Sequence, residues 1–210
     1  IPESVIALGE YKDYLDAHED AILPEVEDII IPGPDAINTE FVSQPYGGGQ
    51  LALETKSSGS ATWGFDIEVA GFYNIKLEYI PIIDGGANIE RKVYINGKVP
   101  FNNLNNVSFQ RVWGNGGDKI VDLTGNEIRP VQVEIPEKRV AYLRDQIGYI
   151  TEPYLIYFDT GYNEITIESV REAMGIFNVI IASKESYPTY AEVYEDYLAK
   201  GYKKVTGKQT

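Results

Sequence analysis

The stretch ATWGFDIEVAGFYNIKLEYIP, residues 61–81, carries the clearest structural signal in this sequence. Every second position in each half is apolar or aromatic: Trp63, Phe65, Ile67 and Val69, then Tyr73, Ile75, Leu77 and Tyr79. Alternation with a period of two predicts β-strands that bury one face and expose the other. We expect a hairpin of two strands joined at Ala70-Gly71. Its inward side chains should pack against later strands near Ile165, Ile167 and Ile180.

Similar alternation recurs along the chain, separated by turn signals. Strands are expected at 29–31, 50–54, 89–96, 107–112, 131–135, 139–143 and 175–183, with a second hairpin over 154–169 that turns at Thr160-Gly161. Asn96-Gly97 is a strong turn signal. Residues 97–130 are rich in Asn and Gly and predict a long loop, which on a rigid scaffold often carries function. Many short strands without strand–helix alternation predict an all-β sandwich.

Both ends of the chain predict helices. Residues 3–20 are acidic and amphipathic, and 189–202 begin with Thr189 and Glu192 as a capping box and end at Gly201. We divide the chain into an acidic helical segment at 1–23, the sandwich at 24–186, a helix at 187–202 and a basic linker at 203–210. The start, without Met or a signal peptide, leads us to expect a processed chain or an excised domain.

The composition narrows the function further. The net charge is −14 and no basic stripe is present, which argues against nucleic acid as a partner. No apolar run reaches the roughly 18 residues that a membrane-spanning helix needs, so no membrane insertion is expected. There is no cysteine, which excludes disulfides. Sixteen Tyr and two Trp suit both sheet faces and sugar surfaces.

Several motifs resemble a known family. The 61–81 stretch, VYINGK (93–98), GYNEITIES (161–169) and GIFNVIIAS (175–183) resemble strands of galactose-binding-like jelly rolls, which include many carbohydrate-binding modules. A longer match comprises IERKVYINGKVPF, GNEIRPVQVE, GYITEPYLIYF, SVREAM and PTYAEVYEDY in this order. These segments resemble the N-terminal module of large extracellular solute-binding proteins of carbohydrate ABC transporters in Gram-positive bacteria.

This resemblance implies a jelly-roll β-sandwich that is secreted and anchored at the cell surface. It also implies two partners, a solute-binding domain that follows in the same polypeptide and the transporter itself. It gives no established ligand for the module. The chain departs from the pattern at Ala173, where Pro is expected, and at Phe177-Asn178, where relatives often carry Ile-Asp. The missing Asp argues against carrying over a metal site.

An oligo- or polysaccharide ligand needs an aromatic surface and planar polar groups on exposed loops. The long loop offers Trp113 beside Arg111 and Asn115. Further polar or aromatic candidates stand at strand ends: Asn126, Arg129, Tyr149, Glu152 and Arg171. Two alternatives remain open. Trp113 could cover the sheet. The groups at strand ends, with Glu172 beside Arg171, could instead form a buried arginine–carboxylate network that fixes the long loop.

Metal and catalytic chemistry have fewer candidates. Asp84, Asp118 and Asp122 lie in flexible loops and offer oxygen ligands for a structural Ca²⁺, the one cofactor we consider. The single histidine, His18, lies in the acidic N-terminal helix, and no spacing selects a carboxylate pair for glycoside cleavage. We therefore expect a non-catalytic carbohydrate-binding module of a surface solute-binding protein. The rival is a structural module without a sugar site that docks on the solute-binding domain, and a carbohydrate-active enzyme is the third reading.

Overall fold

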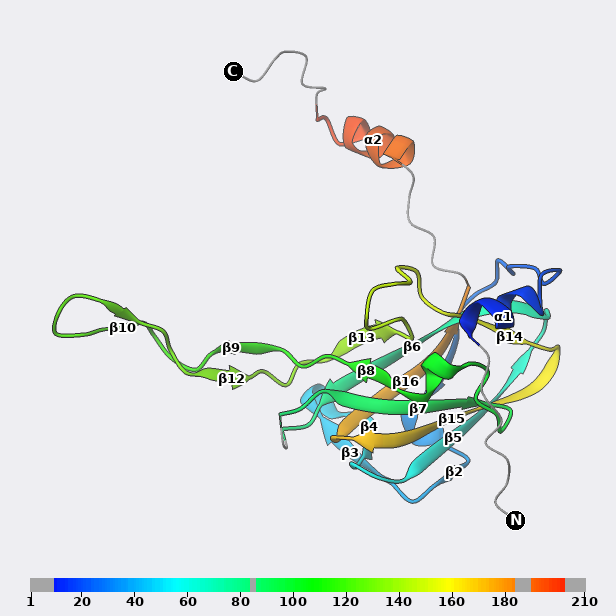
Figure 1. Ribbon diagram of the computed structural model, residues 1–210, viewed down its shortest axis with the longest axis horizontal. Helices are drawn as coiled ribbons and strands as arrows, with labels where there is room; N and C mark the ends of the chain where they lie inside the picture. The colour runs from blue at the N-terminus through cyan, green and yellow to red at the C-terminus, as the bar shows by residue number, and fades with distance from the viewer. Residues whose placement is uncertain (1–9, 84–85, 184–189, 203–210) are drawn as a thin grey trace.

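Two antiparallel sheets packed face to face form the body of the protein in the computed structural model, which describes residues 10–83, 86–183 and 190–202 (Figure 1). The first sheet follows the order β13-β6-β16-β4-β3, with β14 also paired to β6 and β1 to β16. Its strands are β1 (Ile29–Pro32), β3 (Val42–Tyr46), β4 (Gln50–Thr55), β6 (Gly71–Pro81), β13 (Arg139–Tyr142), β14 (Leu155–Phe158) and β16 (Met174–Ala182).

The second sheet follows the order β2-β5-β15-β7-β8. Its strands are β2 (Asn38–Thr39), β5 (Ser60–Ile67), β7 (Ile89–Ile95), β8 (Val107–Phe109) and β15 (Gly161–Arg171). Three short 3₁₀ helices, η1 (Gly33–Asp35), η2 (Gly47–Gly49) and η3 (Asn102–Asn105), join strands. The predicted all-β jelly-roll sandwich with flanking helices is confirmed.

The predicted hairpin at 61–81 is wrong in its pairing, although both strands are present. β5 pairs with β2 and β15 in one sheet, whereas β6 pairs with β13, β14 and β16 in the other. The segment between them crosses from sheet to sheet. β14 and β15 likewise lie in opposite sheets, so the predicted hairpin at 154–169 is also such a crossing.

The core lies between the sheets, and Trp63 is fully buried in it, as predicted. Its indole Nε1 donates a hydrogen bond of 2.9 Å to the carbonyl oxygen of Gly33 in η1. Ile165 stands directly opposite Trp63 in the sheet, and Ile167 also joins the core. Ile180 does not, because it stands opposite Lys76 on the outer face.

A β-bulge explains the misplacement of Ile180. The register of β16 against β6 shifts between Ile176 and Asn178, so one extra residue reverses the alternation of side chains. Ile176 faces the core before the bulge, and Val179 and Ile181 face it afterwards.

The N-terminal helix α1 (Tyr11–Asp16) covers an edge of the first sheet. The hydroxyls of Tyr11 and Tyr14 each accept a 2.8 Å hydrogen bond from the backbone N–H of Leu155 and Tyr157, respectively. These bonds satisfy donors that an edge strand would otherwise leave open. Tyr11 and Tyr14 of α1 therefore bind the edge strand of this chain's own sandwich.

The two predicted turn signals are confirmed. Asn96 and Gly97 have φ values of 49° and 76°, as a type I′ turn requires. Gly201, with φ 86°, follows helix α2 (Tyr190–Ala199) and donates its N–H to the carbonyl of Leu198. The N–H of Tyr202 donates to the carbonyl of Tyr197. This is a Schellman ending. The predicted cap at Thr189 lies outside the described residues, and no helix in the described part is long and apolar enough to cross a membrane.

The long loop expected at 97–130 is largely a two-stranded ribbon. We call residues 112–135 the arm. It is built from β9 (Trp113–Asn115) paired with β12 (Gln132–Glu134), and farther out from β10 (Ile120–Val121) paired with β11 (Glu127–Ile128). Figure 1 shows the arm projecting away from the sandwich. The strand predicted at 131–135 is thus the returning strand of the arm.

Candidate functional site

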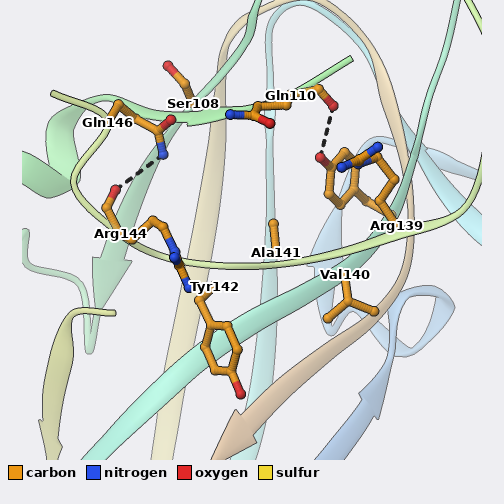
Figure 2. A pocket seen from close by; sticks show the side chains of 9 residues that line it. Ser108, Gln110, Arg139, Val140, Ala141, Tyr142, Arg144 and Gln146 are labelled. Carbon is orange, nitrogen blue, oxygen red and sulfur yellow. Dashed lines mark hydrogen bonds between the residues drawn. The ribbon is translucent and has the colours of Figure 1, made fainter. Parts of the chain in front are cut away.

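A pocket of about 240 Å³ opens between β8, an edge of one sheet, and β13, an edge of the other. Figure 2 shows Ser108 and Gln110 on one side of it, Val140 and Ala141 on the other, and Arg144 and Gln146 at one end. Its lining consists of Tyr79, Ser108, Gln110, Arg139, Val140, Ala141, Tyr142, Arg144 and Gln146. Polar and cationic groups dominate this set.

The two walls are held together through Tyr79. β13 pairs with β6 so that Arg139 stands opposite Tyr79, which places its guanidinium beside the phenol ring. The Tyr79 hydroxyl donates a 2.9 Å hydrogen bond to the carbonyl oxygen of Gln110 just beyond β8. Burial raises the pKa of Tyr79, while the Arg139 charge acts in the opposite direction. Tyr79 therefore remains a neutral donor that fixes the width of the pocket.

The other end of the pocket is formed where the chain leaves β13. The guanidinium carbon of Arg144 lies 5.8 Å from the centre of the Tyr142 ring, a cation–π distance. Gln146 donates from Nε2 to the carbonyl of Arg144 at 3.3 Å. Arginine, glutamine and tyrosine side chains on one pocket can bind the hydroxyls and the apolar face of a sugar.

Asp145 orders the loop that carries Gln146. Its carboxylate accepts backbone hydrogen bonds from Ile147 at 3.1 Å, Tyr149 at 2.7 Å and Ile150 at 3.1 Å. Burial alone would raise the pKa of Asp145, but these N–H donors outweigh it and lower the pKa. The ionised carboxylate thus fixes this side of the pocket at neutral pH.

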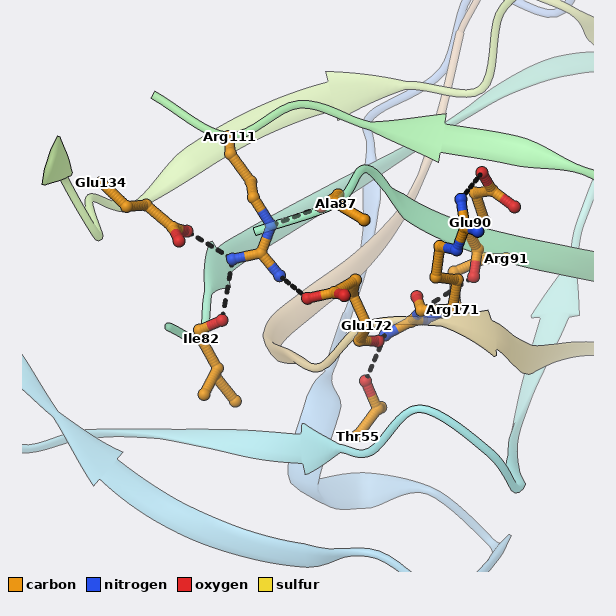
Figure 3. A network of polar contacts seen from close by, with 9 residues as sticks. All are labelled: Thr55, Ile82, Ala87, Glu90, Arg91, Arg111, Glu134, Arg171 and Glu172. Carbon is orange, nitrogen blue, oxygen red and sulfur yellow. Dashed lines mark hydrogen bonds and ion pairs between the residues drawn. The ribbon is translucent and has the colours of Figure 1, made fainter. Parts of the chain in front are cut away.

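Arg111 lies in a buried arginine–carboxylate network (Figure 3). The sequence left such a network open as an alternative and anticipated Glu172 in it, but it did not anticipate Arg111. Its side chain is 2 % exposed and forms ion pairs with Glu134 and with Glu172, the latter at 2.8 Å. The same guanidinium donates to the carbonyls of Ile82 at 2.8 Å and Ala87 at 2.7 Å. Arg111 therefore joins both strands at the base of the arm to the loops beside it.

A second buried arginine, Arg91, lies next to this network and was not foreseen. It donates to the carbonyls of Glu90, Arg171 and Glu172 and to the hydroxyl of Thr55, each at 2.8 to 2.9 Å. Burial, with the nearby Arg111 charge, lowers the pKa of Arg91 to about 9. Glu172 serves both arginines from a left-handed turn with φ 59°.

The other predicted sugar-binding residues do not gather in one place. Trp113, Asn115, Asn126 and Arg129 lie along the arm. Trp113 is 49 % exposed, and its ring lies over Gly86. Asn115 accepts from the Gln132 amide at 2.7 Å, and Asn126 is bonded within its own turn.

Tyr149 and Glu152 are exposed on the loop that follows Asp145, and the Arg171 side chain pairs with Glu90 at 3.5 Å. Their role in sugar binding stays a prediction. The pocket residues Arg139 and Arg144 were missed. The segment KRVAYLRDQ (138–146), with three cations around one tyrosine in an acidic chain, was the signal that could have found them.

The predicted calcium ligands are placed separately. Asp122 accepts from the Thr124 hydroxyl and from the backbone and side chain of Asn126, and these bonds lower the pKa of Asp122 to about 2. Its oxygens therefore hold the turn at the tip of the arm. Asp118 is exposed on the arm, and Asp84 lies outside the described residues. Within the described ranges no three His, Cys, Asp or Glu side chains form a metal-binding group. A structural Ca²⁺ stays a prediction.

No protein-family model matches this sequence, and no curated protein matches it. Among solved structures, a family 35 carbohydrate-binding module from Clostridium thermocellum aligns with TM-score 0.45 and 14% identity over 75% of this chain and 99% of that one. The CBM35 of Cellvibrio japonicus Abf62 aligns with TM-score 0.46 and 12% identity over 76% and 95%.

A GH26-CBM35 β-(1,4)-mannanase from Podospora anserina aligns with TM-score 0.44 and 12% identity over 77% of this chain but only 28% of the enzyme. This chain therefore spans about a quarter of that enzyme and nearly all of the two isolated modules. At these identities and TM-scores the similarity says nothing about the ligand, which has to be argued from the pocket.

Proposed function

We propose that this chain is a non-catalytic carbohydrate-binding module whose site is the pocket between β8 and β13. The proposal rests on one observation: two arginines, two glutamines and a tyrosine line the same pocket. They are Arg139, Arg144, Gln110, Gln146 and Tyr142. Amide and guanidinium groups bind sugar hydroxyls in pairs, and a tyrosine ring packs on the apolar face of a sugar. The remaining groups that line the pocket are neutral, and Arg139 also pairs with Glu137 beside the pocket at 3.4 Å.

The charge and size of the pocket limit the class of ligand that it can bind. A guanidinium binds a carboxylate with two parallel hydrogen bonds, which favours saccharides that carry acidic groups. The net charge of −14 repels polyanions at long range, but salt screens this beyond about 8 Å. A volume of about 240 Å³ lies below the roughly 300–1,000 Å³ typical of ligand pockets. The pocket therefore suits one sugar residue or the end of a chain.

Calorimetry with acidic and neutral oligosaccharides tests the proposal. We expect the native chain to bind an acidic oligosaccharide. Arg144→Gln should weaken this binding at least tenfold, because one charge-assisted hydrogen bond contributes about 1.5–3 kcal/mol. Tyr142→Leu should weaken binding of acidic and neutral sugars alike, since it removes the ring and not the charge.

Trp113→Ala on the arm is the matched comparison, because it removes the aromatic candidate that the sequence suggested. It should leave the affinity unchanged. Loss of binding in Trp113→Ala with full binding in Arg144→Gln would move the site to the arm. Failure of the native chain to bind any oligosaccharide would refute the proposal.

We further propose that the module is extracellular, anchored on a Gram-positive cell, and joined to the solute-binding domain of a carbohydrate transporter. The order of the five motifs that resemble that family supports this context. Labelling intact cells with a reagent that cannot cross the membrane tests it. The protein that contains this chain should be labelled before lysis, and labelling only after lysis would contradict the proposal.

A further inference from the structure

The arm exposes large apolar side chains far from the sandwich. Ile120, Val121, Leu123, Ile128 and Val131 are all exposed, and Leu123 at the turn has 107% of its reference accessibility. A soluble monomer rarely exposes an apolar patch above a few hundred Å², and larger patches mark interaction sites. The arm is therefore a candidate surface for a partner.

The base of the arm is firmly built, so its projection is a property of the fold. Arg111 precedes β9 and pairs with Glu134 at the end of β12, which joins both strands to the sandwich. Gly114 and Gly116 leave room for the side chains of Ile135 and Val133 to lie across β9, because a Cβ at either glycine would come within 2.4 to 2.6 Å of them. These contacts keep the ribbon in register.

The hydrogen-bond pattern of the outer ribbon shows which edge is open. Asp122 donates from its N–H to the carbonyl of Asn126 at 2.9 Å, and antiparallel ladders alternate bonded and non-bonded pairs. Ile128 therefore directs its backbone groups toward Ile120 on β10, whereas Glu127 and Arg129 direct theirs outward. In the described chain β11 pairs with β10 alone. The outer edge of β11 is thus a strand edge free to pair, and it ends at Pro130, which has no N–H.

We propose that this edge pairs with the same edge of a second copy of the chain, antiparallel and with Ile128 opposite Ile128 about a two-fold axis. In this register Glu127 stands opposite Arg129 of the second copy, and Arg129 stands opposite its Glu127. Within the arm Glu127 also pairs with Lys119 at 2.8 Å, an exposed ion pair of the kind that contributes about 0–1 kcal/mol. Opposite charges in directly paired positions stabilise strand pairing, and a two-fold axis forms both pairs at once.

Two further features favour this arrangement. Residues directly opposite each other share a face, so Ile120 and Ile128 from both copies form one continuous apolar row across the four strands. The corresponding pairing of two β10 edges about Ile120 would place Asp118 opposite Asp122, which like charges disfavour. The β11 edge is therefore the self-complementary one.

The arm is long enough to keep the two acidic sandwiches apart when two copies of the chain associate. From Val112 to Ile120 the ribbon spans roughly 25 Å at about 3.3 Å per residue. In the antiparallel dimer the two sandwiches lie at opposite ends, several times the Debye length of about 8 Å apart, so their repulsion is screened. The contact is small, below the roughly 1,200 Å² of standard interfaces, and the dimer is therefore weak and concentration-dependent.

Analytical ultracentrifugation of the whole chain over a hundredfold range of concentration tests the proposal. The native chain should pass from monomer to dimer. Arg129→Glu and Glu127→Arg should each remain monomeric, because each brings like charges together twice. An equimolar mixture of these two variants should recover a 1:1 dimer, because the introduced charges complement each other.

Lys56→Glu is the control, since it reverses an exposed cation on the sandwich and changes the net charge as Arg129→Glu does. It should dimerise like the native chain. A native chain that stays monomeric throughout overturns the proposal. So does a dimer that survives Arg129→Glu, or a pair of monomeric variants that fail to assemble when mixed while circular dichroism shows both folded.

Discussion

The guanidinium of Arg111 has two carboxylates and two carbonyls within bonding distance, and its side chain is almost fully buried. Removing one partner of a buried ion pair leaves the other charge unpaired and typically costs about 3–5 kcal/mol. We expect Arg111→Met to lower the free energy of unfolding by this amount, measured by urea denaturation. Adding Glu134→Gln and Glu172→Gln to it should recover part of the loss, because the stranded charges are then gone.

Arg171→Met provides the comparison for Arg111→Met. The Arg171 side chain is largely exposed and its distance to Glu90 is 3.5 Å. Exposed pairs contribute about 0–1 kcal/mol, so this variant should unfold almost like the native chain. Equal losses in Arg111→Met and Arg171→Met would contradict the role given to the buried network.

Individual residues also show what the sequence could and could not predict. An arginine–carboxylate network that fixes the long loop could be foreseen as an alternative, with Glu172 among its expected members. Its arginine, Arg111, and its second carboxylate, Glu134, could not, since Glu134 and Glu172 reach Arg111 through the closure of the arm and a left-handed turn. These are tertiary contacts that no local pattern records.

At the scale of elements, alternation identified most strands but not their partners. The period of two predicts a strand with one buried face, and the two faces of a sandwich give the same pattern. β5 and β6 therefore looked like a hairpin although they lie in opposite sheets. Likewise, the exposed strands of the arm carry apolar residues without a buried face, so the sequence predicts a long loop with only short strands over 97–130.

The short η1 element gives a direct test of how closely the elements pack. A Cβ at Gly33 would lie 1.9 Å from the carbonyl oxygen of Ile176, which is backbone and cannot move aside as a flexible side chain could. We expect Gly33→Ala to destabilise the fold by at least the roughly 1–3 kcal/mol of overpacking, measured as the free energy of unfolding. Gly47→Ala should be nearly neutral, because nothing lies within 4 Å of its Cβ. Similar effects at both glycines would argue against this packing.

At the scale of the whole molecule, the sequence predicted the sandwich and its two flanking helices, because composition and periodicity depend on the sum of many residues. The pocket was missed for the opposite reason. It arises only where the edges of the two sheets meet, and β8 and β13, which form its walls, lie about thirty residues apart in the chain with the arm between them. The arm separates β8 and β13 in the sequence, whereas the fold of the sandwich places them on either side of the pocket.

Three buried or half-buried tyrosines make the stability of the whole molecule sensitive to alkaline pH. Burial raises the pKa of Tyr14, Tyr46 and Tyr154 from 10 to about 12. Between pH 10 and 12 the unfolded chain has lost these protons while the folded chain keeps them, so the unfolded state binds fewer protons. The stabilisation is complete below pH 10 and declines as the pH rises toward 12. Urea unfolding at a series of pH values should show this decline.

Tyr14→Phe isolates one contribution to this pH dependence. The variant loses the hydrogen bond from the Tyr157 N–H and should be less stable at neutral pH. Its stability should nevertheless fall less steeply between pH 10 and 12, because no proton is lost from that position in either state. The native chain, unfolded by urea at the same pH values, is the reference for this slope. A slope in Tyr14→Phe as steep as that of the native chain would show that the Tyr14 hydroxyl is not buried against the sandwich as described.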